Sequence, residues 1–380
     1  MIIAKIIFVV LIIYVVVALI LLYGWNKTRN FKPNDFAVTE TTKLSVIVAM
    51  RNESKNALKL IECLNNQELD KNLFEVIIID DNSDDGTLSE IEKAKSLYKE
   101  LDIKIIDLSL QRKEGKKNAI ATGVDISNGE LIITTDADCY LPSTWLNTIH
   151  DYYIKHKPEM IMAPVSFSNN TNLFGKVQAI EFMSLMFVTC STANIYYPVL
   201  ANGANIAYTR SLYDECKGFS SNMKYASGDD MFMMMNARKR LGKKAIRFLK
   251  SDKAIVETQA EVNFNKFVNQ RVRWISKGSG FNAKYVSIAG VSYYFVNLIF
   301  FISIFLPLFV KATIISVVLC WLAKLLIDLI LLYQYASFEK RLNLLAVLPI
   351  AELYNVTYLS IIGLLANVRG YVWKGRKIKK

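Results

Sequence analysis

The sequence predicts an α/β domain with a mostly parallel sheet, flanked by transmembrane helices. Three observations carry this prediction. Hydrophobic residues make up 52% of the 380 residues, which is high for a soluble chain. Apolar stretches long enough to span a bilayer lie near both ends of the chain. Between them, short β-branched runs alternate with helical patterns, which favours a sheet with helices on both faces.

The first element is an apolar helix over residues 2–23, which is long enough to cross a membrane. A secretory signal has a shorter apolar core and a small-residue cleavage site, so we expect an uncleaved anchor. Lys5 precedes most of the segment, whereas Lys27, Arg29 and Lys32 follow it. The positive-inside rule therefore places the residues after the anchor in the cytoplasm.

The strands and helices of the α/β domain follow the anchor in alternation. We expect strands at 43–50, 74–81, 102–108 and 131–135, and helices at 54–66, after Thr87 through Leu97, and from Gly115 onward. The carboxyl ends of parallel strands meet at one edge of a sheet, where ligands bind. The sequence therefore predicts that one crevice is surrounded by the polar residues Glu53, Asp81, Lys116, Asp136 and Asp138.

The aspartates of Asp136-Ala137-Asp138 follow a buried strand directly. Two carboxylates this close repel each other unless a cation lies between them. Mg²⁺ and Mn²⁺ take oxygen ligands and usually share them with substrate phosphates. Taken alone, the motif is equally compatible with a solvated turn that caps the next helix.

Residues 160–280 continue the domain with a less regular pattern. They contain the small-residue loop around Asn202 and Gly203, and the acidic pair Asp229 and Asp230. An amphipathic helix is expected over residues 263–277. It places Gln270, Arg273 and Trp274 at positions i, i+3 and i+4, and therefore on one face.

The C-terminal third contains apolar stretches at 291–310, 312–333 and 344–366, the last interrupted by Pro349, Glu352 and Asn355. If all three span, the basic tail lies outside, against the positive-inside rule. If one is re-entrant or interfacial, the tail stays cytoplasmic. Lys324 and Asp328 are expected to pair or to face the bundle interior, because charges inside a membrane are costly.

Composition excludes several other classes of protein. The formal net charge is +12, and the basic excess includes a tail beside an apolar segment, which favours contact with anionic lipid over nucleic acid. The five cysteines show no C-x-x-C spacing, which argues against a disulfide framework and a structural zinc site. The two histidines, His150 and His156, lie in a polar stretch and are expected at the surface, which disfavours a histidine-based triad.

Taken in order, these motifs resemble those of membrane-bound glycosyltransferases of family 2, which have a GT-A fold, a Rossmann-like mixed sheet. The resemblance covers residues 44–280. Its motifs are Ser45-Val46-Ile47-Val48-Ala49-Met50-Arg51-Asn52-Glu53, Ile79-Asp80-Asp81-Asn82-Ser83-Asp84-Asp85-Gly86-Thr87, Gly115-Lys116-Lys117-Asn118-Ala119, Asp136-Ala137-Asp138, Gly228-Asp229-Asp230 and Gln270-Arg271-Val272-Arg273-Trp274. An acidic pair and Q-x-x-R-W after the D-x-D make the resemblance specific.

The resemblance implies a role for each matching residue. The donor nucleotide, usually of a UDP-sugar, would be bound by Glu53, Asp81, Lys116 and Asp136. Asp136 and Asp138 would lie at the diphosphate and at Mg²⁺ or Mn²⁺. Asp230 matches the general base, and Asp229 stands where relatives often have glutamate. The acceptor and the diphosphate would be contacted by Gln270, Arg273, Trp274, Asn202 and Gly203.

The implied protein is an inverting, metal-dependent hexosyltransferase on the cytoplasmic face of a bacterial inner membrane, active in cell-envelope glycan or glycolipid synthesis. Its acceptor is a lipid or a polysaccharide. A processive polysaccharide synthase and a non-catalytic nucleotide-sugar-binding scaffold are the alternatives. The expected parts are an anchor at 1–24, a linker at 25–43, a catalytic domain at 44–285, a membrane region of two to three helices at 286–368 and a basic cytoplasmic tail at 369–380.

Overall fold

The computed structural model describes residues 2–33, 40–111, 113–168, 172–219, 228–281, 283–365, 370–374 and 376–378. The chain forms two compact units. The sheet unit comprises Thr28–Ser168 and Tyr196–Gln259, and the helical unit comprises Met1–Lys27, Asn169–Ile195 and Ala260–Lys380. Residues 44–285 therefore contribute to both units, and the domain limits expected from the sequence stay a prediction.

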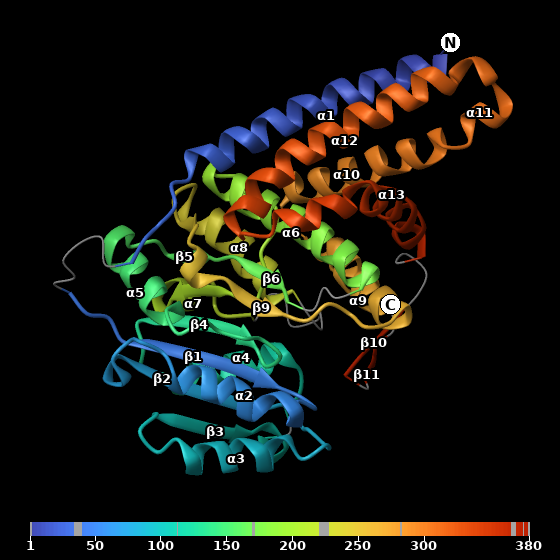
Figure 1. Cartoon of the computed structure of the whole chain (residues 1–380). Coiled ribbons are helices and arrows are strands. Elements are labelled where there is room, and N and C mark those ends of the chain that lie inside the picture. Colours follow the sequence, from blue (N-terminus) through green and yellow to red (C-terminus); the bar gives the residue numbers. More distant parts are fainter. Residues whose placement is uncertain are drawn as a thin grey trace. The chain divides into compact units, whose positions relative to one another are not determined.

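In its described residues, the sheet unit has a seven-stranded sheet in the order β3-β2-β1-β4-β7-β5-β8. Figure 1 shows β3, β2, β1 and β4 side by side in that order. The strands are β1 (Leu44–Met50), β2 (Phe74–Asp80), β3 (Ile103–Asp107), β4 (Leu131–Asp136), β5 (Met160–Met162), β7 (Ile206–Thr209) and β8 (Ile246–Phe248). β1 is parallel to β2 and β4, and β2 to β3, whereas β7 is antiparallel to β4 and β5. The mixed, mostly parallel sheet predicted from the sequence is confirmed.

The central strands are almost completely buried, which explains their near-continuous apolar sequence. The helices of this unit are α2 (Ser54–Asn65), α3 (Thr87–Leu97), α4 (Lys116–Ile126), α5 (Trp145–His156), α7 (Arg210–Glu215) and α8 (Asp229–Leu241). Short 3₁₀ helices lie at Lys71–Leu73, Leu108–Gln111 and Asp252–Ala254, and β6 (Val165–Phe167) pairs with β9 (Val256–Thr258).

The expectation of two surface histidines is wrong for His150, which is only 2% exposed. Its Nε2 accepts a hydrogen bond from the Thr42 N–H at 3.3 Å, and its Nδ1 lies 3.3 Å from Asp151 Oδ1. Because both ring nitrogens have partners, burial of this polar ring on α5 carries little penalty.

The helical unit contains α1 (Ile2–Lys27), α6 (Leu173–Asn194), α9 (Phe264–Ser276), α10 (Lys284–Ser303), α11 (Leu306–Phe309), α12 (Ile314–Phe338) and α13 (Leu348–Leu365), with 3₁₀ helices at Lys277–Gly280, Lys311–Thr313 and Leu342–Val347. α1 runs alongside α12 in Figure 1. It also approaches α6 so closely that a Cβ on Gly24 would lie 2.2 Å from the Ser191 carbonyl oxygen. Trp25 packs on Phe187 and Tyr335 at ring-centroid distances of 5.3 and 5.6 Å.

In the described part of the chain, five helical segments are long and apolar enough to cross a membrane: Ile6–Lys27, Leu173–Asn194, Lys284–Phe309, Ile314–Phe338 and Leu342–Leu365. The chain is therefore a membrane-associated protein. The tail, expected only as a basic stretch, forms the antiparallel strands β10 (Tyr371–Trp373) and β11 (Arg376–Ile378), and β10 lies against α9.

The expected pairing of Lys324 with Asp328 is confirmed, with Lys324 Nζ 2.7 Å from Asp328 Oδ2. Two further groups join this pair. Glu352 of α13 accepts a hydrogen bond from Lys324, and the Tyr14 hydroxyl of α1 donates to Asp328. We call these four residues the buried charge cluster. It connects α1, α12 and α13 through polar contacts in an otherwise apolar bundle.

Candidate active site

The loops that follow β1 and β2 are joined by hydrogen bonds. The Asp81 N–H donates to the Met50 carbonyl at 2.7 Å, and the Glu53 N–H donates to Thr87 Oγ1 at 2.8 Å. Both carboxylate residues are buried, with 8% of Glu53 and 1% of Asp81 exposed. The sheet thus places these two expected donor-binding residues on adjoining loops at the carboxyl ends of neighbouring strands.

Asp81 also fixes the start of α4. Its Oδ1 accepts a hydrogen bond from the Gly115 N–H at 2.8 Å. Gly115 has φ of +93°, a conformation that side chains rarely adopt, and it immediately precedes the first residue of the helix. Lys116 is that first residue, so the Asp81 contact determines where the Lys116 side chain starts.

Lys116 lies among three carboxylates. Its Nζ donates to Asp136 Oδ1 at 2.6 Å and lies 4.0 Å from Asp229 Oδ2. Burial alone would lower the pKa of Lys116, but the nearby charges of Asp136, Asp229 and Asp230 outweigh it and raise the pKa above its usual range. Lys116 is therefore a permanent cation at this position.

Asp229 and Asp230 occupy the first turn of α8, after Gly228 in a left-handed conformation. A helix N-terminus favours negative charge, so both carboxylates are well placed. Asp230 Oδ2 accepts a hydrogen bond from the Gly203 N–H at 3.1 Å. A Cβ on Gly203 would lie 3.5 Å from both Lys116 Nζ and Asp229 Oδ2.

We call Lys116, Asp136, Gly203, Asp229 and Asp230 the carboxylate–lysine cluster. Its members come from α4, the end of β4, the loop before β7, and α8. The sequence predicted each residue as part of a site, and the structure brings these five together. The neighbouring Asn202 binds within its own loop, because its Oδ1 accepts a hydrogen bond from the Ala204 N–H at 3.0 Å.

The D-x-D pair fits a divalent cation through its chemistry. Asp136 is half-buried and Asp138 is exposed, with Asp138 Oδ2 3.4 Å from Thr258 Oγ1. Among the described residues, no three His, Cys, Asp or Glu side chains form a complete ligand set. Mg²⁺ and Mn²⁺ commonly take one or two carboxylates and complete their shell with water and substrate phosphates. Two hard oxygen donors at a strand end suit that mode of binding.

The remaining expected site residues lie in the helical unit, on α9. Gln270 Nε2 donates to Glu261 Oε1 at 3.2 Å, Arg273 is half-buried, and the Trp274 ring lies 6.4 Å from that of Phe182. Their expected contact with the acceptor and the diphosphate stays a prediction.

Sequence reasoning missed the partners that hold α9 in place. Arg271, within the same motif, is 2% exposed and pairs with Glu181 of α6, with its Nη2 2.6 Å from Glu181 Oε2. Tyr358 of α13 donates a hydrogen bond to Glu181 as well. The available signal was an arginine on the apolar face of an amphipathic helix, four residues after Phe267 and three before Trp274.

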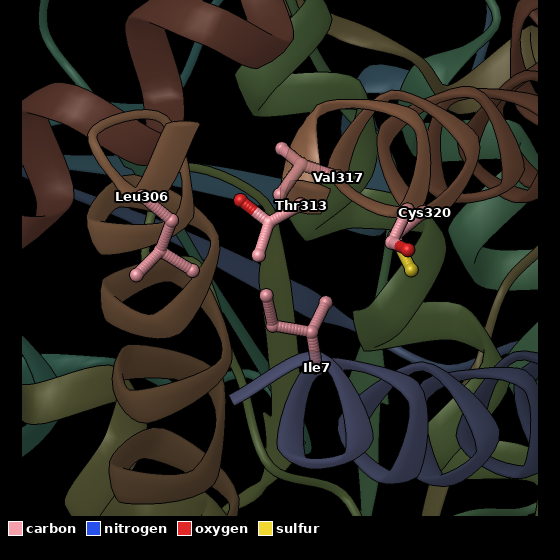
Figure 2. Close-up of a pocket in the computed structure, with 6 residues that line it drawn as sticks. Ile7, Leu306, Thr313, Val317 and Cys320 are labelled. Atoms are coloured by element: carbon pink, nitrogen blue, oxygen red, sulfur yellow. The ribbon is translucent and has the colours of Figure 1, made fainter. Parts of the chain in front are cut away.

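A small cavity among the apolar helices is not a second ligand site. Ile7, Leu306, Thr313, Val317 and Cys320 line it (Figure 2). It offers about 10 Å³, which is roughly the space that one water molecule needs.

Family models agree with this geometry. The model described as "Glycosyl transferase family 2" matches residues 45–216. The model described as "Glycosyl transferase family group 2" matches residues 131–358, more than half of the chain. The chain therefore belongs to the family 2 glycosyltransferases, and the resemblance seen in the sequence is confirmed.

Two curated relatives are named for different products, one for a polysaccharide and the other for a glycolipid. A poly-β-1,6-N-acetyl-D-glucosamine synthase of Staphylococcus aureus is 29% identical over 183 residues, which cover 46% of this chain and 41% of that protein. A β-monoglucosyldiacylglycerol synthase of Trichormus variabilis is 32% identical over 143 residues, which cover 37% of this chain and 30% of that protein. The chain thus matches less than half the length of each relative.

A solved structure shows the fold. The mannosyltransferase PcManGT of Pyrobaculum calidifontis, in complex with GDP-Man and Mn²⁺, superposes with a TM-score of 0.53 at 18% identity. The match covers 92% of this chain and 98% of that one. The expected GT-A architecture, a mixed sheet accompanied by membrane-type helices, is confirmed.

Proposed function

We propose that this protein is an inverting glycosyltransferase that moves a hexose from a nucleoside diphosphate sugar to a membrane-associated acceptor. A UDP-sugar is the donor that we favour. The carboxylate–lysine cluster carries the proposal, because it places a cation and three carboxylates at one point on the carboxyl-end edge of the sheet.

The donor nucleotide would lie against Glu53 and Asp81, and its diphosphate near Asp136 and Lys116. Asp136 and Asp138 would hold Mg²⁺ or Mn²⁺, which when bound neutralises charge on the departing diphosphate. Lys116 supplies a fixed positive charge beside the same group. Arg273 would grip a phosphate in bidentate fashion, with Gln270, Trp274, Asn202 and Gly203 nearer the acceptor.

The protein itself would supply the base that removes the proton from the acceptor hydroxyl. The acceptor hydroxyl is a poor nucleophile, and a carboxylate that accepts its proton activates it. We assign this role to Asp230, which is half-buried, whereas Asp229 is only 5% exposed and faces Lys116. A single base with attack from the face opposite the leaving group inverts the anomeric centre.

We place the sheet unit on the cytoplasmic side of a bacterial inner membrane, with a role in cell-envelope glycan or glycolipid synthesis. The positive-inside bias after α1 supports this orientation. The acceptor is a lipid or a polysaccharide. The lipid-modifying relative supports the first, and the polymer-forming relative together with Gln270, Arg273 and Trp274 supports a processive synthase as the second candidate.

The test is to incubate membranes that contain the protein with labelled UDP-sugars and Mn²⁺, using an Asp230→Asn variant as the matched control. Label in the organic phase indicates a lipid acceptor, and label in high-mass material indicates a polysaccharide. Absence of transfer with every UDP-sugar, while UDP still binds, would leave the non-catalytic scaffold as the explanation.

A further inference from the structure

We infer that Glu181, Arg271 and Tyr358 form a positioning network that sets the direction of the Gln270–Arg273–Trp274 face of α9. The inference rests on the proposed function, because it assigns that face to the acceptor and the diphosphate. All three network residues belong to the helical unit, and they come from α6, α9 and α13.

The Arg271 guanidinium makes both hydrogen bonds and aromatic contacts. Its Nε donates to Glu181 Oε1 at 3.0 Å and its Nη2 donates to Glu181 Oε2 at 2.6 Å. Its Nη1 donates to the side-chain oxygen of Gln270. The guanidinium carbon lies 4.4 Å from the ring centroid of Phe267 and 4.2 Å from that of Trp274. Two of the three expected motif side chains are therefore direct partners of Arg271.

Glu181 connects the other two residues of the network, because both donate hydrogen bonds to its carboxylate. It is 5% exposed on α6 and accepts hydrogen bonds from Arg271 and from the Tyr358 hydroxyl. A bidentate arginine–carboxylate pair restrains both distance and orientation. The restraint matters here because α9 has only 13 residues, too few for a stable helix without tertiary contacts.

The network restrains the rotational orientation of α9 about its helix axis. Arg271 points to the buried side, where Phe267 and Val272 pack with Tyr358 and Ile362 of α13. Fixing Arg271 therefore fixes the direction of Arg273, two residues further along the helix and half-buried. Apolar packing alone would hold α9 in place but would restrain its rotation less, since such contacts are non-directional.

The experiment separates positioning from stability with the double variant Glu181→Met/Arg271→Met. Replacing a buried ion pair with apolar residues of similar volume usually preserves folding, so this protein should reach the membrane in normal amounts. Tyr358→Phe is the second variant, since it removes one hydroxyl and keeps the ring. Glu352→Gln is the matched control, because it alters a buried carboxylate of the same unit that belongs to the buried charge cluster.

Two readouts are measured for each variant. The first is steady-state transfer, where we expect kcat of the double variant to fall on the order of 100-fold. The KM values for the acceptor and for the UDP-sugar should both rise, because the face is assigned to the acceptor and to the diphosphate of the donor. The second is acrylamide quenching of Trp274, obtained as the difference from a matching Trp274→Phe protein. Quenching should increase in the double variant and less in Tyr358→Phe, and stay unchanged in Glu352→Gln.

Unchanged Trp274 quenching in the double variant overturns the inference, whatever the activity. Increased quenching with wild-type kcat and KM values also overturns it, because the face would then move without effect on the reaction. If quenching increases but the unaltered protein transfers no sugar, the proposed function fails while the positioning of the α9 face stands.

Discussion

Charge balance at the carboxylate–lysine cluster determines what it can bind. One lysine faces three carboxylates, with Asp136 at 2.6 Å and Asp229 at 4.0 Å from its Nζ. An anionic diphosphate alone would be repelled by the remaining negative charge. A divalent cation bound at Asp136 and Asp138, as proposed, would offset two of these negative charges. We therefore expect the metal and the nucleotide to bind together.

Substitution of Asp230 tests the base assignment. Asp230→Asn keeps the shape of the side chain and an oxygen that can accept the Gly203 N–H bond, but it cannot take a proton. Transfer should fall by about 10²- to 10⁴-fold, while UDP affinity measured by calorimetry stays unchanged. Asp229→Asn is the comparison, and its loss should be smaller. Near-normal transfer by Asp230→Asn together with an inactive Asp229→Asn would reverse the assignment.

The carboxylate–lysine cluster was predictable from the sequence because each member follows a strand or begins a helix. The Glu181–Arg271 pair was not predictable. Its members lie 90 positions apart, and nothing local to α6 marks Glu181 as a partner for α9. Pairing at that distance depends on tertiary packing, which a periodicity pattern does not encode.

Among the secondary-structure elements, too, those with a clear local pattern were predictable and those that depend on distant neighbours were not. The expected strand at 74–81 became β2 (Phe74–Asp80), because an apolar run with polar ends marks it. The expected helix at 54–66 became α2 (Ser54–Asn65), because its apolar residues recur at helical spacing and form one buried face. β5 and β8 were missed. Each has three residues, too few for an alternation pattern, and each depends on neighbours far away in the sequence.

The buried charge cluster provides a prediction for helix packing. Lys324→Met leaves Asp328 and Glu352 buried without their shared cation, which should destabilise the helical unit by about 3–5 kcal/mol. The measurement is the melting temperature and the yield of folded protein in detergent. The triple variant Lys324→Met/Asp328→Leu/Glu352→Met should recover most of the loss. A triple variant that is less stable than Lys324→Met would contradict this account.

Chain connectivity constrains how the whole molecule meets the membrane. Residues on both sides of α6 return to one sheet, where β5 pairs with β7, so a single crossing by α6 would separate paired strands. We therefore expect that α6 does not cross, although it is long and apolar enough. α9 begins within a few residues of β9 and is not among the possible spans, so we expect no membrane crossing between β9 and α9.

We expect the tail to lie on the same side of the membrane as α9, because β10 packs against α9. The segment from α10 to α13 then starts and ends on one side, which requires an even number of crossings. α13 is the helix that we expect not to cross. It buries the polar residues Glu352, Asn355 and Ser360, and its Tyr358 and Ile362 pack against Phe267 and Val272 of α9. We therefore keep, as a prediction, the alternative that the sequence favours, in which one stretch does not span and the tail is cytoplasmic.

Labelling of single introduced cysteines with a membrane-impermeant maleimide tests this topology. Lys311→Cys lies between α11 and α12, at the far end of two crossings, and should react in intact cells. Glu100→Cys in the sheet unit and Lys374→Cys in the tail should react only after permeabilisation. The unaltered chain, whose five cysteines lie in partly or fully buried positions, gives the background. Reaction of Lys374→Cys in intact cells would show that α13 crosses, and reaction of Glu100→Cys there would overturn the cytoplasmic location of the site.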